Sequence, residues 1–101
     1  MYHNSQGVSQ DNKEAMSWYR KAAERGQARA QEFLGVMYKE GAGGAPQDYE
    51  EAVMWFRKAA EQGDASGQYN LGMMYVLGKG VPQDNVQAHK WFNLAAAQGN
   101  K

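Results

Sequence analysis

The sequence predicts an all-α protein, a right-handed superhelix of antiparallel helix pairs, and three observations lead to this fold class. Trp18, Trp55 and Trp91 are spaced 37 and 36 residues apart, and each lies in a similar stretch of sequence. Self-similarity at a period of roughly 20–50 residues is typical of stacked repeats. The 101 residues include no Cys, Thr or Ile and many Ala and Met, which favours helices over strands. Apolar residues also recur at helical spacing.

The second helix of each repeat, here called helix B, contains the tryptophan. Its apolar residues follow an i, i+3, i+4, i+7, i+8 pattern, which places them on one buried face of an amphipathic helix. In the middle copy these residues are Ala52, Trp55, Phe56, Ala59 and Ala60. Their counterparts are Ala15, Trp18, Tyr19, Ala22 and Ala23 in the first copy, and Ala88, Trp91, Phe92, Ala95 and Ala96 in the last.

Both ends of helix B are marked by residues suited to terminate a helix. An aspartate precedes each copy and is followed three residues later by Glu or Gln, which predicts a capping box. A glycine follows each copy and suits the left-handed conformation that closes many helices. The expected starts are Asp11, Asp48 and Asp84, with Glu14, Glu51 and Gln87 completing the boxes, and the expected ends are Gly26, Gly63 and Gly99.

The first helix of the pair, here called helix A, occurs in full twice, before the loops at 41–48 and 78–84. In the first copy its buried stripe is expected to comprise Ala30, Leu34, Met37 and Tyr38. A glycine in mid-helix, Gly35 or Gly72, is less favourable than Ala by about 0.8–1 kcal/mol. We therefore expect the backbone of another helix to approach there too closely for a Cβ. The glycine-rich loops are not followed by the Lys-Ser/Thr pair of a phosphate-binding loop and have no preceding strand or G-x-G-x-x-G pattern, so they are expected to connect helices.

These motifs in register resemble the Sel1-like repeat, a relative of the tetratricopeptide repeat with a longer loop between its helices. The resemblance rests on A-x-A-x-x-x-L-G-x-M-Y, then G-V-x-Q-D, then A-x-x-W-F-x-K-A-A-x-Q-G, and it covers residues 2–99. It implies an adaptor or scaffold that holds a protein or peptide partner on the concave face lined by helix A. Some relatives are stapled by disulfides, but this chain has no Cys.

The chain is expected to be one domain, residues 1–101, with a partial repeat at 1–27 and full repeats at 28–64 and 65–101. Met1–Tyr2 aligns with the end of a helix A, so the order of helices is B-A-B-A-B. Repeat arrays need neighbours to cover their terminal faces. We therefore expect the faces beside Trp18 and Tyr19, and beside Trp91 and Phe92, to lack a neighbour. We hypothesise either a longer array or association of the ends between chains.

Candidate partner-binding residues are those of helix A that lie outside its buried stripe. They are Arg29, Glu32, Val36 and Lys39 in the first copy, and Ser66, Tyr69, Asn70, Met73, Val76 and Leu77 in the second. In the second copy, Tyr69, Met73 and Val76 with Leu77 form an apolar ladder at helical spacing. The ladder either binds an apolar or amphipathic peptide or packs against a flanking repeat.

Asn70 has two open interpretations. Related repeats use an Asn at this place to hydrogen-bond a bound peptide, with Arg29 as a nearby positive charge in this chain. The alternative is an intramolecular hydrogen bond that ties adjacent helices together. Phe33 takes the place of Asn70 in the preceding copy, so a clamp of two asparagines is absent.

The sequence gives little material for catalysis, so we expect a protein that is not an enzyme and needs no cofactor or metal. His3 and His89 lie far apart along the array, and no serine lies in a G-x-S-x-G or S-x-x-K context. Acidic and basic residues balance at eleven each without a Lys/Arg run, which argues against nucleic-acid binding. No apolar run could span a bilayer.

The polar N-terminus slightly favours the cytoplasm, with export open if a signal peptide was removed. Two functions from different classes remain, an adaptor for a protein or peptide and a structural or oligomerising segment. Hydrolase activity, described for some members of the family, is a remote third.

Overall fold

The computed structural model describes residues 5–42 and 46–99, and the side chains of 13–42 and 46–98 within them. These residues form five α-helices and no β-strand, which confirms the predicted all-α superhelix and the B-A-B-A-B order. The helices of type B are α1 (Ser5–Glu24), α3 (Tyr49–Glu61) and α5 (Asn85–Gly99). The helices of type A are α2 (Ala28–Glu40) and α4 (Ala65–Leu77).

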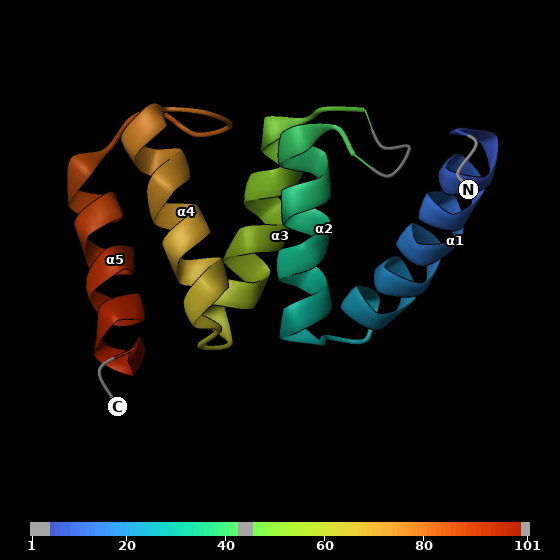
Figure 1. The fold of residues 1–101 in the computed structure, drawn as a ribbon. Coiled ribbons are helices and arrows are strands. Elements are labelled where there is room, and N and C mark those ends of the chain that lie inside the picture. The colour runs from blue at the N-terminus through green and yellow to red at the C-terminus, as the bar shows by residue number, and fades with distance from the viewer. Residues whose placement is uncertain (1–4, 43–45, 100–101) are drawn as a thin grey trace.

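The five helices stand side by side in chain order, and the described chain is elongated, with extents of 45 × 27 × 25 Å (Figure 1). Each helix packs mainly on the one before it and the one after it, and α2 also contacts α4. A repeat array has this arrangement because each helix pair can bury its apolar face only against its neighbours.

The predicted apolar face of helix B is buried in the middle copy, where all five of its residues are at most 5 % exposed. Phe56 belongs to the larger core cluster, together with Leu71, Met74 and Trp91. Trp55 belongs to a second cluster with Ala23, Ala30 and Leu34. The tryptophan of helix B therefore packs toward the preceding repeat, which gives the array a direction.

The aspartate caps of α3 and α5 form as predicted, but only half of each capping box does. The side chain of Asp48 accepts a hydrogen bond from the backbone N–H of Glu51 at 3.1 Å, and Asp84 accepts one from Gln87 at 3.1 Å. The backbone N–H of each aspartate donates instead to a carbonyl of the preceding helix A, that of Tyr38 at 2.8 Å or Tyr75 at 3.0 Å. The reciprocal bond of the box is not needed because that donor is already satisfied.

The expected start of the first helix B at Asp11 is wrong, because α1 already begins at Ser5. The two later copies have Pro46 or Pro82 two residues before the capping aspartate, and the first copy has Ser9 there. Proline disfavours helical geometry in the residue before it and lacks an N–H, so it stops the helix from extending. Without it α1 continues through Asp11. The expected helix A end at Met1–Tyr2 lies outside the described residues.

Two of the three glycines expected to close helix B behave as predicted, whereas Gly99 is the last helical residue of α5. The glycines inside helix A have a different cause from the one expected. Gly26 and Gly63 adopt positive φ values of 95° and 96°. A Cβ on Gly72 would lie 2.7 Å from the ring of Phe92, and one on Gly35 would meet the ring of Phe56. Both glycines therefore admit an aromatic side chain of helix B, not another backbone. The close backbone approach occurs at Gly67, beside α3.

Candidate partner-binding surface

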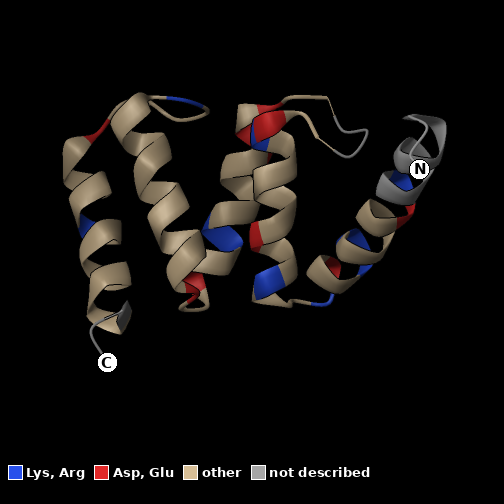
Figure 2. Ribbon diagram, in the orientation of Figure 1, with Lys and Arg blue, Asp and Glu red and all other residues tan. Residues whose placement is uncertain are grey.

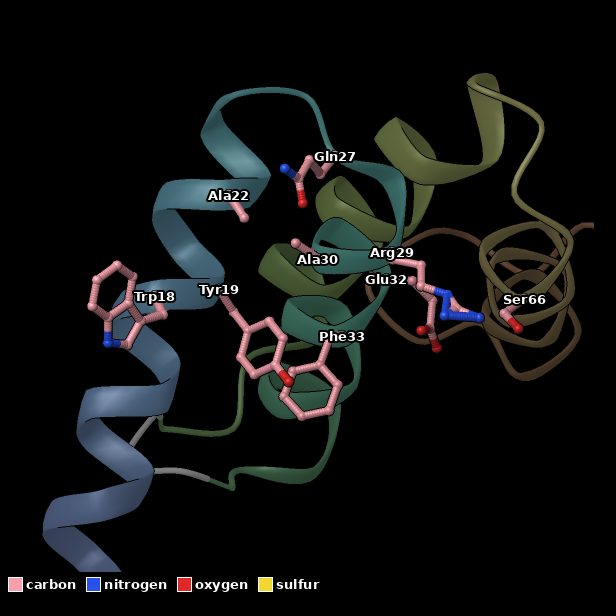
Figure 3. A pocket seen from close by; sticks show the side chains of 9 residues that line it. All are labelled: Trp18, Tyr19, Ala22, Gln27, Arg29, Ala30, Glu32, Phe33 and Ser66. Atoms are coloured by element: carbon pink, nitrogen blue, oxygen red, sulfur yellow. The ribbon is translucent and has the colours of Figure 1, made fainter.

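A groove of about 610 Å³ opens between α1 and α2 and reaches the start of α4. Its aromatic wall consists of Trp18 and Tyr19 from α1 and Phe33 from α2, and the rings of Tyr19 and Phe33 are 4.1 Å apart between centroids. Arg29 and Glu32 of α2 extend toward Ser66 on α4 at its polar end (Figure 3). The structure thus brings Arg29, Glu32 and Ser66, three of the predicted residues, into one groove.

The carboxyl group of Glu32 at this polar end has a shifted pKa. Partial burial raises the pKa of its carboxyl group, and the nearby charge of Asp64 raises it further, while Arg29 and Lys39 act in the opposite direction. The amide of Asn70 donates a hydrogen bond to the Glu32 carboxylate at 3.2 Å. Asn70 therefore ties α4 to α2, which is the intramolecular role that was one of its two interpretations.

The predicted apolar ladder on α4 does not line one continuous groove. Tyr69 and Met73 line a groove of about 550 Å³ together with Phe92, Ala95 and Ala96 of α5. The rings of Tyr69 and Phe92 lie 5.5 Å apart between centroids. Tyr69 is 54 % exposed, so this part of the ladder is accessible.

The other predicted residues lie elsewhere on the array. Leu77 and Lys39 line a third groove of about 380 Å³ beside Tyr49 and Lys79. Val36 and Val76 are half-buried against the larger core cluster. The predicted set is therefore divided among three grooves and the edge of the core, and it does not form one site.

Exposure at the two ends of the described array agrees with the prediction about terminal faces except at Trp91. Trp18 is 69 % exposed, as expected of a residue without a neighbour. Trp91 is only 6 % exposed, so the expectation is wrong for this side chain. The reason is that each of these tryptophans packs toward the preceding repeat, which is present for Trp91. Phe92, directly after it, is partly exposed.

Sequence reasoning missed two recurring polar contacts that join successive repeats. Gln31 and Gln68, each 4 % exposed, donate to the carbonyls of Ala23 at 3.0 Å and Ala60 at 3.2 Å. They accept hydrogen bonds from Gln62 at 2.7 Å and Gln98 at 2.9 Å. The only signal was the recurrence of Gln at the same place in both copies of each helix, since glutamine is ordinarily a surface residue.

The second contact joins an arginine of helix B to a tyrosine of the following helix A. Arg57 donates to the hydroxyl of Tyr75 at 2.5 Å, and its guanidinium lies 5.7 Å from the centre of that ring. Arg20 makes the same pair of contacts with Tyr38. The last copy has Asn93 in place of the arginine.

Charged residues are concentrated on the first three helices (Figure 2). Within α4 there is no Asp, Glu, Lys or Arg, and α5 contains only Lys90. The groove beside α1 is therefore mixed in character, whereas the groove beside α5 is apolar.

The described part of the chain holds no cluster of three or more His, Cys, Asp or Glu side chains that could bind a metal ion. His89 lies exposed on α5, and His3 lies outside the described residues. Within the same residues, no helix has the length and apolar character required to cross a bilayer.

The Sel1 repeat profile matches residues 1–27, 28–64 and 65–100. The chain belongs to the Sel1 repeat family. Proteins of this family generally serve as protein-interaction modules without enzymatic activity, and these repeats typically bind proteins. Among curated protein sequences, none matches the chain significantly.

Several solved bacterial structures share this fold. A protective antigen of uropathogenic Escherichia coli with the Sel1-like repeat fold is 49 % identical, with a TM-score of 0.84, over 87 % of this chain and 19 % of that protein. A Sel1 repeat protein from Oxalobacter formigenes is 46 % identical, with a TM-score of 0.80, over 83 % of this chain and 63 % of that protein. Cysteine-rich protein B of Helicobacter pylori is 30 % identical, with a TM-score of 0.77, over 95 % of this chain and 66 % of that protein. The chain thus spans about a fifth of the first of these proteins and under two thirds of the second.

Proposed function

We propose that this Sel1 repeat protein is an adaptor that binds a peptide segment of a partner protein on the helix A face, in the groove beside Trp18, Tyr19 and Phe33. The observation that carries this proposal is the gathering of three exposed aromatic rings, 69 %, 37 % and 37 % exposed, in one groove with Arg29 and Glu32. Aromatic residues and arginine are enriched where proteins bind one another, and a few of them supply most of the binding energy.

The groove favours a segment that offers an apolar side chain beside polar groups. The aromatic wall would bury the apolar side chain, and Arg29 would pair with a carboxylate or a backbone carbonyl of the segment. The Glu32 carboxylate already accepts from Asn70 and has room for a second donor from a bound backbone.

A library of random peptides displayed on phage, selected on the immobilised chain, tests this proposal without knowledge of the natural partner. The repeats themselves suggest a variant that should still fold, because the second helix A carries Asn70 and Ser66 where the first carries Phe33 and Arg29. The double variant Phe33→Asn/Arg29→Ser should therefore remain helical by circular dichroism. We expect selected peptides to bind it at least about tenfold more weakly, the loss of one or two central contacts.

The matched control is Lys58→Ser, which removes an exposed cation from α3 outside the three grooves. It should bind the selected peptides as the unmodified chain does. Peptides that bind the double variant equally well would place the binding surface elsewhere, and a selection that enriches no sequence would argue against a peptide-binding adaptor.

A second candidate function is that of an oligomerising segment, favoured by the exposure of Trp18 where Trp55 and Trp91 are buried. An exposed aromatic face of this kind is also suited to contact another chain. This function predicts a mass that rises with concentration in light scattering and falls in a Trp18→Gln variant. A constant monomer mass would eliminate it.

A further inference from the structure

The outer face of α5 carries two exposed aliphatic side chains that the stacking of repeats does not explain. Val86 is 79 % exposed and Leu94 is 44 % exposed, and they stand two turns apart on the helix. Side chains with this spacing lie on one face of an α-helix, so both point the same way. At a rise of roughly 1.5 Å per residue, about 12 Å separates them along the helix axis.

The middle repeat shows that this face stays open when repeats stack. By the spacing of the repeats, the counterparts of Val86 and Leu94 are Glu50 and Lys58 on α3. Both counterparts are exposed, although the middle repeat has a neighbour on each side. Exposure at these two places therefore does not depend on whether another repeat lies beside α5.

The residues at these places change from charged to apolar along the array. In the first two helices of type B they are Lys13 and Lys21 of α1 and Glu50 and Lys58 of α3. The charges of α3 suit its ends, because an acidic residue in the first turn and a basic residue in the last turn stabilise a helix. Val86 and Leu94 lack this benefit and expose apolar surface instead. Such a departure from the local pattern indicates an interaction surface.

A single cation lies between the two aliphatic side chains. Lys90 is exposed and stands one turn from each of them, and α5 contains no other Asp, Glu, Lys or Arg. Its ammonium group lies 4.8 Å from the centre of the Trp91 ring, a contact that favours a fixed position for the charge. The face thus presents apolar, cationic and apolar side chains in turn. We call it the α5 outer stripe, and its residues are Val86, Lys90 and Leu94.

We propose that the α5 outer stripe binds an amphipathic helix of a partner protein in which an Asp or Glu lies between two large apolar residues at the same spacing. A helix lying along α5 has the same rise per residue, so its three side chains can meet the stripe in register. The apolar residues would cover Val86 and Leu94, and the carboxylate would pair with Lys90. The stripe shares no residue with the groove of the proposed function.

Charge argues against a second copy of this chain as the occupant. A two-fold pairing of the stripe with itself would place Val86 opposite Leu94 and the two Lys90 side chains opposite each other. Like charges in such a position are unfavourable. No Asp or Glu of the sequence has Val, Leu, Met or an aromatic residue four places away on both sides. The helices of a second copy therefore do not supply the complementary pattern.

A phage-displayed library of helical peptides, selected on the immobilised full chain, tests this proposal. The variant Val86→Glu/Leu94→Lys installs the residues of the middle repeat, so it should remain helical by circular dichroism. We expect peptides with the apolar–acidic–apolar pattern to be enriched and to bind this variant at least about tenfold more weakly. The matched control is Phe33→Asn/Arg29→Ser, which alters the groove of the proposed function and should leave their affinity within about twofold.

A second pair of variants tests the carboxylate of the partner helix. Lys90→Gln removes the cation of the stripe, whereas Lys13→Gln removes an exposed lysine from α1. Lys90→Gln should weaken binding about threefold, the loss of one exposed ion pair, and should make binding less sensitive to salt. Lys13→Gln should change neither property. In NMR spectra of the isotope-labelled chain, a selected peptide should shift the amide signals of Val86, Lys90 and Leu94.

Three results would overturn the proposal. One is a selection that enriches no apolar–acidic–apolar pattern, or peptides that bind Val86→Glu/Leu94→Lys as tightly as the unmodified chain. Another is a set of peptides that lose binding only in Phe33→Asn/Arg29→Ser, which would support the proposed function and exclude the stripe. The third is a mass that rises with concentration in light scattering and is reduced by Val86→Glu/Leu94→Lys, which would show that a second copy covers the stripe.

Discussion

Trp18 and Trp91 occupy the same place in their repeats, yet the first is 69 % exposed and the second 6 %. Residue type and position within the repeat are identical, so the difference comes from the neighbours alone. Helix B directs its tryptophan toward the preceding repeat and the following aromatic residue toward both helices A beside it. The two ends of the described array therefore expose different sides of helix B, the tryptophan side at α1 and the side of the following aromatic residue at α5.

This difference gives the two end surfaces different chemistry. The surface on α1 presents aromatic rings beside Arg29 and Glu32, and the surface on α5 presents alanines beside the uncharged helix α4. One structural unit thus presents two distinct exposed surfaces, because each end of the described array leaves different residues of the unit uncovered.

The largest expected difference in stability is between alanine replacements of the equivalent residues Trp55 and Trp18. Replacement Trp55→Ala removes a residue that is 5 % exposed and should lower the free energy of unfolding by about 3–5 kcal/mol. Replacement Trp18→Ala should change it by less than about 0.5 kcal/mol, because most of that side chain is already in water. Urea denaturation of both variants measures the two values. Similar losses would mean that Trp18 is buried in solution.

The next effect compares two glycines that face aromatic rings, Gly35 and Gly72. Gly35→Ala would collide with Phe56, which is fully enclosed, at a cost of about 1–3 kcal/mol. That exceeds the gain of about 0.8–1 kcal/mol from replacing a mid-helix glycine. In Gly72→Ala the new Cβ meets Phe92, which is half-buried and free to shift. The cost of this contact and the gain from replacing a mid-helix glycine should therefore nearly cancel. Thermal melts that rank Gly72→Ala as the more harmful change would contradict this account.

Loss of a helix cap should lower stability by a smaller amount, which should be the same in the middle and at the end of the array. Asp48→Ala and Asp84→Ala each remove a cap that accepts a backbone hydrogen bond at 3.1 Å. Each should lower the free energy of unfolding by about 1 kcal/mol, because capping is local and does not depend on neighbouring repeats. Denaturation curves for the two variants provide the comparison. A clearly larger loss at one site would show that the cap also supports packing.

The smallest effect concerns Glu32, whose pKa is raised by partial burial and by the charge of Asp64. Because the folded state holds this proton more tightly than the unfolded state, the group contributes stability at low pH that is lost as pH rises through the carboxyl range. Glu32→Gln lacks this titration and can still accept from Asn70. The free energy of unfolding of this variant should therefore equal that of the unmodified chain at about pH 4. At about pH 7 it should be higher by less than about 0.5 kcal/mol. Urea titrations at both pH values test the sign.

The fold was predictable from sequence because its causes are local and repeated. The apolar spacing around Trp55 defines the buried face of helix B, and the glycines Gly26 and Gly63 adopt the positive φ that the pattern indicates. The caps at Asp48 and Asp84 needed only one side-chain oxygen and the first turn of a helix. The caps and the closing glycines do not depend on how repeats stack.

The features that were missed depend on stacking or on the absence of one residue. Burial of Trp91 follows from the side on which helix B meets its neighbour, which apolar spacing does not reveal. The early start of α1 follows from Ser9 in the place of a proline, a single difference within a matching pattern. The candidate site was only partly predictable, because the ladder residues Tyr69 and Leu77 share a helix but lie in different grooves.

The buried glutamines give the array a fixed register. Gln31 joins α1, α2 and α3 through two hydrogen bonds, and Gln68 joins α3, α4 and α5 in the same way. Faces of alanine, leucine and methionine would tolerate sliding of one helix along the next with little change in apolar contact. A slip of one turn would leave each buried amide without partners, which is strongly unfavourable. The amides therefore exclude the misaligned stackings that an apolar interface alone would permit.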